Sequence, residues 1–269
     1  MADKIHLPLS LRFIRQFDFP HKLGICERLF SNQLRKNGIC WVETAAGPVW
    51  KLDLSNSTHR WIVYGQYEGS AFFSWIRRSL SGDAVIVDSG ANIGQMTLYF
   101  GTYFPKSRVL AFEPGAHQAN WLSECLARNP KVAAKILPYA LGESEQTMYL
   151  KLGGHPSSHG SQNVVTMDVG ETPVHVVTLA HVLASEQIET VDLWKLDVEG
   201  SELAALAGAK EWLKAKRIRA LWIETMGENG RRIVDFMTDM GYRAVFLNRR
   251  GYETGVRDNR AGNTLFLPA

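Results

Sequence analysis

The sequence predicts an α/β protein in which helices cover both faces of a mostly parallel sheet. Short apolar runs alternate with amphipathic segments from residue 84 to the end of the chain, as strands alternate with helices in such proteins. The first run, AVIVD at 84–88, is typical of a parallel strand that is covered on both faces. Acidic residues end four of these runs, at the edge of the sheet where ligands of such folds bind.

The composition is that of an ordinary globular chain. The 269 residues are 45% hydrophobic and 21% charged, and a formal net charge of +3 is too small to indicate a nucleic-acid partner. The three cysteines form no C-x-x-C pair, which is typical of a reducing compartment and predicts no cysteine metal site or disulfide framework. The N-terminal apolar run is too short for a signal peptide, and no run of about 18 apolar residues exists. We therefore expect a cytoplasmic protein without a membrane span.

Residues 1–80 are expected to form an extension of helices and a β-hairpin that contributes to the substrate pocket. In order, the patterns predict partial helix over 8–36, then two strands within 39–54 around a tight turn at Ala46-Gly47-Pro48. A helix over 59–80 follows and is interrupted near Gly65. No motif in this extension indicates which substrate it would recognise.

Residues 81–269 are expected to form the main domain. The predicted main strands, in order, are 84–88, 108–114, 131–141, 191–197, 218–225, 242–247 and 263–268. The predicted helices are 94–104, 117–129, 201–216 and 231–241. Two further β segments, 147–153 and 174–179, are interpreted as an insertion around a loop rich in Gly, Ser and His.

Four acidic residues are predicted to meet at one edge of the sheet. Each ends its own apolar strand, and they are Asp88, Glu113, Asp197 and Glu224. One or two acids in such positions are commonly solvated turn residues. Because the carboxyl ends of parallel strands lie together, four of them indicate a polar binding site at this edge.

The turn VDSGANIGQ at 87–95 has the spacing D-x-G-x-N-x-G. A dinucleotide-binding turn has a glycine where Asn92 stands, so that the backbone can approach the pyrophosphate. The carboxylate of Asp88 would also repel a phosphate. These features favour a ligand with an amino group and no phosphate, such as S-adenosylmethionine (SAM). Glu113, at the end of the second strand, is placed to accept both hydroxyls of a ribose.

Three segments, VIVDSGANIG, VLAFEP and DLWKLDVEGSELAALAGA, resemble signature segments of the FkbM-type SAM-dependent methyltransferases over roughly residues 60–268. The resemblance implies a class I, Rossmann-like methyltransferase fold, with a seven-stranded, mostly parallel sheet whose last strand is antiparallel. It implies that residues 81–269 form the SAM-binding methyltransferase domain, with SAM as methyl donor and usually a hydroxyl acceptor. One departure is that Ala180 and His181 follow Thr178-Leu179, where the family often has an acidic pair; we interpret this as loss of a helix-capping feature.

The residues and the resemblance together assign a set of candidate cofactor-binding positions. They are Glu68, Asp88, Gly90, Asn92, Gly94, Glu113, Pro114, Ala140 and Asp197. The two glycines are expected to meet needs of the backbone, and Pro114 to stiffen its loop. The resemblance places Ala140 near the adenine, although ordinary packing explains it equally well. Glu68 could face the methionine end of SAM or be a solvated acid at a helix start.

Asp197 and Glu199 are the candidate catalytic residues. A hydroxyl acceptor needs a base or a hydrogen-bond acceptor while its oxygen attacks the methyl group. Asp197 is placed for the amino group of the cofactor or for the acceptor's proton, and Glu199 is expected to orient the acceptor. The alternative is that Glu199 caps the helix that begins at Ser201.

No metal is expected. His155 and His159 lie in the segment GGHPSSHGSQN, whose Pro, Gly and Ser residues exclude the helix that would pair them on one metal ion. The acceptor is expected to be a small-molecule or glycan hydroxyl, on a sugar or a natural-product intermediate, with a peptide amide as alternative. A NAD- or nucleotide-sugar-binding oxidoreductase is a second possibility, against which Asn92 and the lack of Tyr-x-x-x-Lys argue. A non-catalytic SAM sensor is a third, against which the intact Asp88, Glu113 and Asp197 argue.

Overall fold

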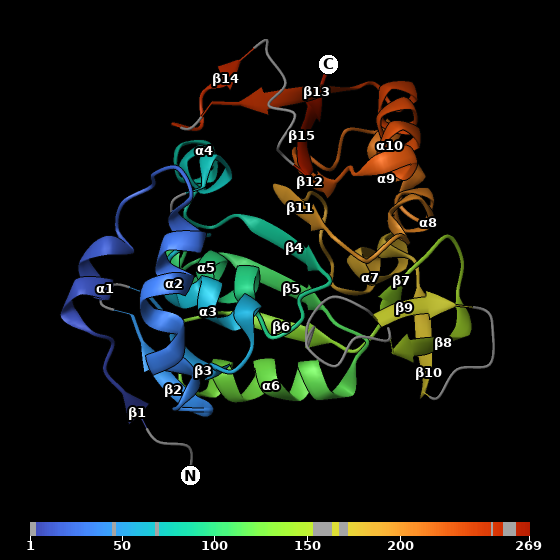
Figure 1. Ribbon diagram of the computed structural model, residues 1–269. Coiled ribbons are helices and arrows are strands. Elements are labelled where there is room, and N and C mark those ends of the chain that lie inside the picture. The colour runs from blue at the N-terminus through green and yellow to red at the C-terminus, as the bar shows by residue number, and fades with distance from the viewer. Residues whose placement is uncertain are drawn as a thin grey trace.

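An eight-stranded sheet forms the centre of the computed structural model (Figure 1), which describes residues 4–44, 47–67, 70–152, 163–166, 172–248, 250–254 and 262–269. The strand order is β14-β13-β15-β12-β11-β4-β5-β6. The parallel centre consists of β4 (Val85–Ser89), β5 (Arg108–Phe112), β6 (Ala134–Leu137), β11 (Leu193–Leu196) and β12 (Leu221–Glu224). The carboxyl ends of these strands therefore lie at one edge.

The last long strand is antiparallel, as predicted. β15 (Asn263–Pro268) lies between β12 and β13 (Tyr242–Leu247) and is antiparallel to both. The predicted count of seven strands is one short of the described sheet. The additional strand, β14 (Glu253–Thr254), pairs with the edge strand β13. Two residues are too few to produce a periodic apolar pattern, so this strand could not be predicted from the sequence.

Helices cover both faces of the sheet, and each face has its own hydrophobic cluster. Neighbouring residues of one strand alternate between the clusters, as Ile86 and Val87 of β4 do. One face carries α4 (Ala71–Ser79), α5 (Gln95–Tyr103) and α6 (Ala116–Ala127). The other carries α7 (Leu179–Ser185), α8 (Glu202–Ala207), α9 (Lys210–Lys214) and α10 (Gly227–Asp239).

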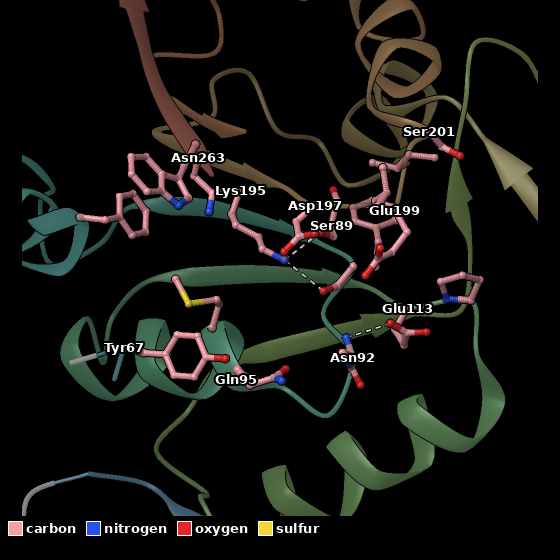
Figure 2. A pocket seen from close by; sticks show the side chains of 18 of the residues that line it. Tyr67, Ser89, Asn92, Gln95, Glu113, Lys195, Asp197, Glu199, Ser201 and Asn263 are labelled. Carbon is pink, nitrogen blue, oxygen red and sulfur yellow. Dashed lines mark hydrogen bonds and ion pairs between the residues drawn. The ribbon is translucent and has the colours of Figure 1, made fainter. Parts of the chain in front are cut away.

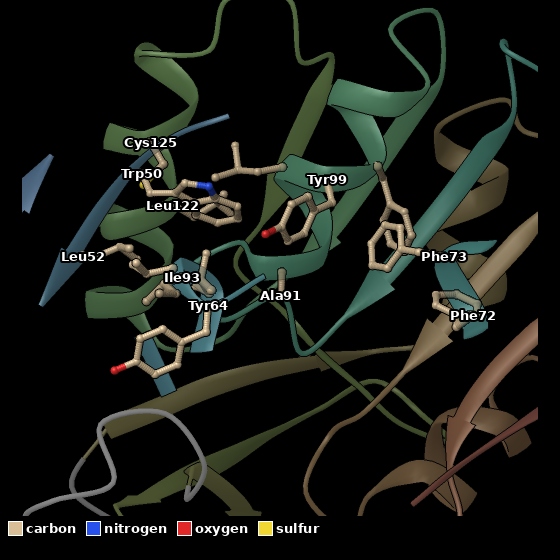
Figure 3. Close-up of a cluster of buried hydrophobic side chains, with 14 of the residues drawn as sticks. Trp50, Leu52, Tyr64, Phe72, Phe73, Ala91, Ile93, Tyr99, Leu122 and Cys125 are labelled. Carbon is tan, nitrogen blue, oxygen red and sulfur yellow. The ribbon is translucent and has the colours of Figure 1, made fainter. Parts of the chain in front are cut away.

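The first eighty residues pack against the same cluster as α5 and α6 (Figure 3). Their elements are β1 (Lys4–Ile5), α1 (Leu9–Ile14), α2 (Lys22–Arg35), β2 (Ile39–Glu43), β3 (Val49–Asp53) and α3 (Ser57–Val63), followed by α4. Trp50 of β3 packs on Tyr99 of α5, with the ring centroids 5.1 Å apart. Asn129, after α6, accepts a hydrogen bond from the amide of Val49 at 2.8 Å. The predicted hairpin is present as the antiparallel pair β2–β3.

Two predicted elements are each divided in two. The predicted strand 131–141 consists of β6 in the main sheet and β7 (Ala140–Leu141) in a second sheet, with Pro138 between them. Proline has no N–H for the ladder, so the strand cannot continue through it. The predicted helix 201–216 consists of α8 and α9, which meet at Gly208. The backbone carbonyl of Gly142 lies so close to Gly208 that a Cβ there would overlap it.

The predicted β insertion is the second sheet, in the order β7-β10-β8-β9. Its other strands are β8 (Gln146–Leu152), β9 (Asn163–Thr166) and β10 (Thr172–Val177). His155 and His159, for which no metal role was expected, and the glutamate at position 68 lie outside the described residues. Within the described ranges, no helix is both long and apolar enough to cross a membrane.

Candidate functional site

The turn between β4 and α5 approaches the end of β11 closely. Gly90 has φ of +72°, and a Cβ there would overlap the carbonyl oxygen of Asp197. Gly94 has φ of +95°, and a Cβ there would overlap the side chain of Leu122. A side chain at either position would be strained as well as displaced, because L-residues rarely adopt these φ values. The two glycines therefore let the turn lie against β11 and α6.

Two backbone amides hold the side chain of Glu113, which directly follows β5. Its Oε2 accepts a hydrogen bond from the N–H of Asn92 at 2.8 Å, and its Oε1 accepts one from the N–H of Gly115 at 2.8 Å (Figure 2). The side chain is 5% exposed, and burial raises the pKa of Glu113, although these amides and Lys195 act in the opposite direction. Each oxygen keeps a lone pair for a further donor.

Asp88 lies behind the cavity wall and does not line the cavity. Its Oδ2 accepts a hydrogen bond from the hydroxyl of Thr97 at 2.6 Å, and its Oδ1 lies 3.5 Å from the ammonium of Lys195. Lys195 also lies 3.4 Å from Oδ2 of Asp197. Burial alone would lower the pKa of Lys195, but Asp197 and Asp88 outweigh it, and the pKa is raised. Asp88, the predicted acid at the end of β4, is thus separated from the cavity by Lys195, with which it forms an ion pair and which lines the cavity.

The loop after β11 is shaped by Glu202, the second glutamate of the D-V-E-G-x-E segment. Its buried carboxylate accepts hydrogen bonds through Oε1 from the amides of Val198 at 3.1 Å and Gly200 at 3.0 Å. Its Oε2 accepts a third from the side chain of Asn229 at 2.9 Å. The helix that follows has no side-chain cap, and it is Glu202 that binds the amides of Val198 and Gly200 in the turn before it.

Glu199 lies in this loop and is unusual both in its backbone φ angle and in the pKa of its carboxyl group. Its φ is +52°, in the left-handed region, and no hydrogen bond joins its carboxylate to another described residue. Partial burial of the carboxyl group and the negative charges of Asp197, Glu224 and Glu202 raise the pKa of Glu199 to about 7, against the influence of Lys195. A carboxyl group with this pKa takes up and releases protons near neutral pH.

A cavity of about 410 Å³ lies at the carboxyl ends of the strands and joins these groups. The predicted site residues that line it are Gly90, Asn92, Glu113, Pro114, Ala140, Asp197 and Glu199. Three other predicted residues do not line the cavity: Gly94, Asp88, and Glu224 of β12. Figure 2 shows the carboxylates of Glu113, Asp197 and Glu199 directed into the same space.

Several lining residues were not predicted. They are Thr58, Gln66, Tyr67, Ser70, Phe72 and Phe73 from the first eighty residues, and Ser89, Gln95, Met96, Phe112, Tyr139, Leu141, Lys195, Val198, Ser201, Trp222 and Asn263 from the remainder. Phe72 stacks on Trp222 with the ring centroids 4.4 Å apart, which gives the cavity an aromatic end. Only Lys195 carried a sequence signal, since a lysine within the apolar strand LWKL needs a buried partner.

Among the described residues, the site has no cluster of side chains that could bind a metal ion. In the part of the chain that the structure describes, no group of three or more His, Cys, Asp and Glu residues could hold a metal ion. Of the carboxylates that line the cavity, Asp197 is held by Lys195 and Glu113 by two backbone amides.

Known proteins have sequences that are similar to this region. The "Methyltransferase FkbM domain" family matches residues 88–244. The chain is 29% identical over 200 residues to "Methyltransferase sdnD" of Sordaria araneosa, a match that covers 61% of this chain and 75% of that protein. It is 27% identical over 192 residues to "31-O-demethyl-FK506 methyltransferase FkbM" of Streptomyces tacrolimicus, covering 60% and 73%. Among solved structures, the METTL16 MTase domain aligns with 97% of this chain and 81% of its own at 10% identity, with a TM-score of 0.44.

Proposed function

We propose, because the chain belongs to the FkbM methyltransferase family, that it transfers the methyl group of SAM to a hydroxyl oxygen of a sugar or a natural-product intermediate. The observation that carries the proposal is Glu113, whose two oxygens are fixed by backbone amides at the wall of the cavity, next to a turn unsuited to phosphate. Such a carboxylate can accept hydrogen bonds from two adjacent hydroxyls of a ribose.

The residues present fit this cofactor. Glu113 would hold the ribose, with Pro114 and Ala140 beside the adenine, and Asp197 would bind the amino group. When bound, SAM supplies a methyl group on a positively charged sulfur. The carboxylates at this edge of the sheet favour such a cation electrostatically.

Glu199 is the group best suited to receive the proton of a hydroxyl acceptor. The sequence assigned this task first to Asp197, but the carboxylate of Asp197 already forms an ion pair with the ammonium of Lys195 at 3.4 Å. Glu199 lines the same cavity, has no hydrogen-bond partner among the described residues and has a pKa of about 7. In the proposed reaction the hydroxyl oxygen of the acceptor attacks the methyl group, and the proton of this hydroxyl passes to the carboxylate of Glu199.

The chemical class of the acceptor is inferred from the name of a relative and from the residues that line the cavity. A relative named for 31-O-demethyl-FK506 acts, by its name, on an oxygen of a natural product. We propose that residues of the first eighty that line the cavity, among them Tyr67 and Phe72, contribute to the acceptor pocket. Methylation of a peptide amide is the alternative. A panel of hydroxylated sugars, hydroxylated natural products and peptides, assayed with SAM labelled in the methyl group, distinguishes the two.

The first prediction tests the cofactor. SAM is expected to bind with micromolar affinity, on the order of −8 kcal/mol, and Glu113→Ala is expected to weaken binding by about 1–3 kcal/mol, because a charged acceptor of two hydroxyls is lost. Isothermal titration calorimetry with SAM, S-adenosylhomocysteine and NAD measures both. Glu124→Ala is the matched control, since that exposed carboxylate of α6 pairs with Lys51 outside the cavity. Preference for NAD, or equal SAM affinity in the two variants, would contradict the assignment.

The second prediction concerns metal ions. Methyl transfer is expected to continue at an undiminished rate in excess EDTA, because the proposed base is a carboxylate and no step requires a Lewis acid. Initial rates before and after dialysis against the chelator check this. Loss of activity that Mg²⁺ restores would identify Asp197 as a metal ligand instead.

A further inference from the structure

The ammonium group of Lys195 joins two segments that form the floor of the cavity. It donates to the backbone carbonyl of Ser89, the last residue of β4, at 3.2 Å and to that of Gly90, in the turn after β4, at 3.1 Å. It also lies 3.4 Å from the carboxylate of Asp197 (Figure 2). On its other side the carboxylate of Asp88 lies 3.5 Å away. An ammonium has three hydrogens, and four protein oxygens surround this one, so it has no donor left for a ligand.

Lys195 is also the one cation among the described residues that line the cavity. The carboxylates around it come from every neighbouring strand: Asp88 on β4, Glu113 after β5, Asp197 and Glu199 after β11, and Glu224 on β12. The phenol of Tyr67, from the first eighty residues, also faces this charge cluster. A single buried positive charge therefore balances several negative ones, and its removal would affect all of them.

We propose that Lys195 is a positioning residue: its ammonium fastens the glycine turn to the end of β11 and keeps Asp197 from accepting the acceptor's proton, which leaves that task to Glu199. The inference rests on the proposed function, because it concerns which carboxylate serves as the base. Its geometry is independent of any ligand.

The electrostatic consequence has a definite sign. The positive charge of Lys195 lowers the pKa values of Glu113, Glu199 and Glu224 relative to what burial and neighbouring acids alone would produce. Loss of this charge therefore moves the pKa of each of these carboxylates further upward.

The test compares Lys195→Met with the wild type by ¹³C NMR titration of protein labelled at the side-chain carboxyls of Asp and Glu, without ligand. The signal that Glu199→Gln removes identifies Glu199, and that which Asp197→Asn removes identifies Asp197. In Lys195→Met the signal of Glu199 is expected to titrate about 1 pH unit higher. The rising limb of the pH dependence of kcat/KM is expected to move upward by the same amount, because Glu199 must be ionised to act.

Two variants separate positioning from simple destabilisation. Lys22→Met removes another ammonium that is equally buried and donates to the carbonyls of Arg15 and Gly65; it should leave the titrations of Asp197 and Glu199 unchanged. Lys195→Arg keeps the charge and should restore the wild-type titrations. If Lys195→Met does not fold, the double variant with Asp88→Asn, which relieves the unpaired buried carboxylate, replaces it.

Identical carboxyl titrations in Lys195→Met and the wild type would overturn the inference. Because this readout needs no cofactor, it is independent of the proposed function. If the wild type bound no SAM while the titrations shifted as expected, the proposed function would fail and the electrostatic role of Lys195 would stand.

Discussion

Replacing Glu199 with glutamine is expected to lower kcat by about 10²- to 10⁴-fold, the range typical of removing a positioned base. Glutamine keeps the size of the side chain and cannot receive the acceptor's proton. The carboxylate lines the cavity and has a pKa of about 7, so kcat/KM of the wild type should rise as the pH increases to about 7 and then level off. Transfer of tritium from methyl-labelled SAM to an acceptor found in the panel measures the rate.

Two neighbouring carboxylates provide the comparisons for Glu199→Gln. Asp197→Asn should weaken SAM binding as well as slow turnover, because its carboxylate is assigned to the amino group of the cofactor. Glu224→Gln removes a carboxyl group whose pKa is also raised, by burial, Asp197 and Glu202, but which does not line the cavity. It should retain most of the turnover. Near-full activity of Glu199→Gln together with an inactive Asp197→Asn would return the role of base to Asp197.

Replacing Gly90 with alanine is expected to have the largest effect on stability. The new Cβ would overlap the backbone carbonyl of Asp197, which cannot move without displacing the end of β11, and φ at this position is +72°. Overpacking and backbone strain together should lower the free energy of unfolding by roughly 3 kcal/mol or more. The floor of the cavity would be displaced as well, so SAM affinity should fall more than tenfold.

Gly200→Ala is the matched control for Gly90→Ala. Gly200 also has a positive φ, +99°, but no atom lies within 4 Å of the position of a Cβ. Strain then acts without a clash and should cost about 1–2 kcal/mol. Urea denaturation and calorimetry compare the two variants. Equal losses would mean that φ alone, and not the approach of β4 to β11, requires the glycine at position 90.

The elements with strong local patterns could be predicted from the sequence. The strands that became β4, β5, β11 and β12 show continuous apolar runs, and the helices between them show amphipathic spacing. The division at Pro138 and the division at Gly208 were missed for different reasons. Pro138 was visible in the sequence, whereas the close approach of Gly142 to Gly208 depends on a segment distant in the chain.

The position of the site was also predictable, because carboxyl ends of parallel strands always lie at one edge. Glu113, Asp197 and Glu199 do line one cavity there. The role of Glu202 was not foreseen, although it belongs to the same D-V-E-G-x-E segment as Glu199. Its hydrogen bonds to Val198 and Gly200 depend on how the loop turns, which residue types alone do not reveal.

The sequence by itself determined most strands of the main sheet and which end of the sheet carries the acids, since the strands follow from each residue's near neighbours. Only the tertiary structure decided which acid is paired. Lys195 lies opposite Asp88 because β11 and β4 are adjacent in this register, although the two are far apart in the chain. Glu199 forms no ion pair with another described residue and lies near the like charges of Asp197, Glu224 and Glu202. Acidity depends on burial and on distances between charges, and both are set by how the strands are ordered, not by their sequences.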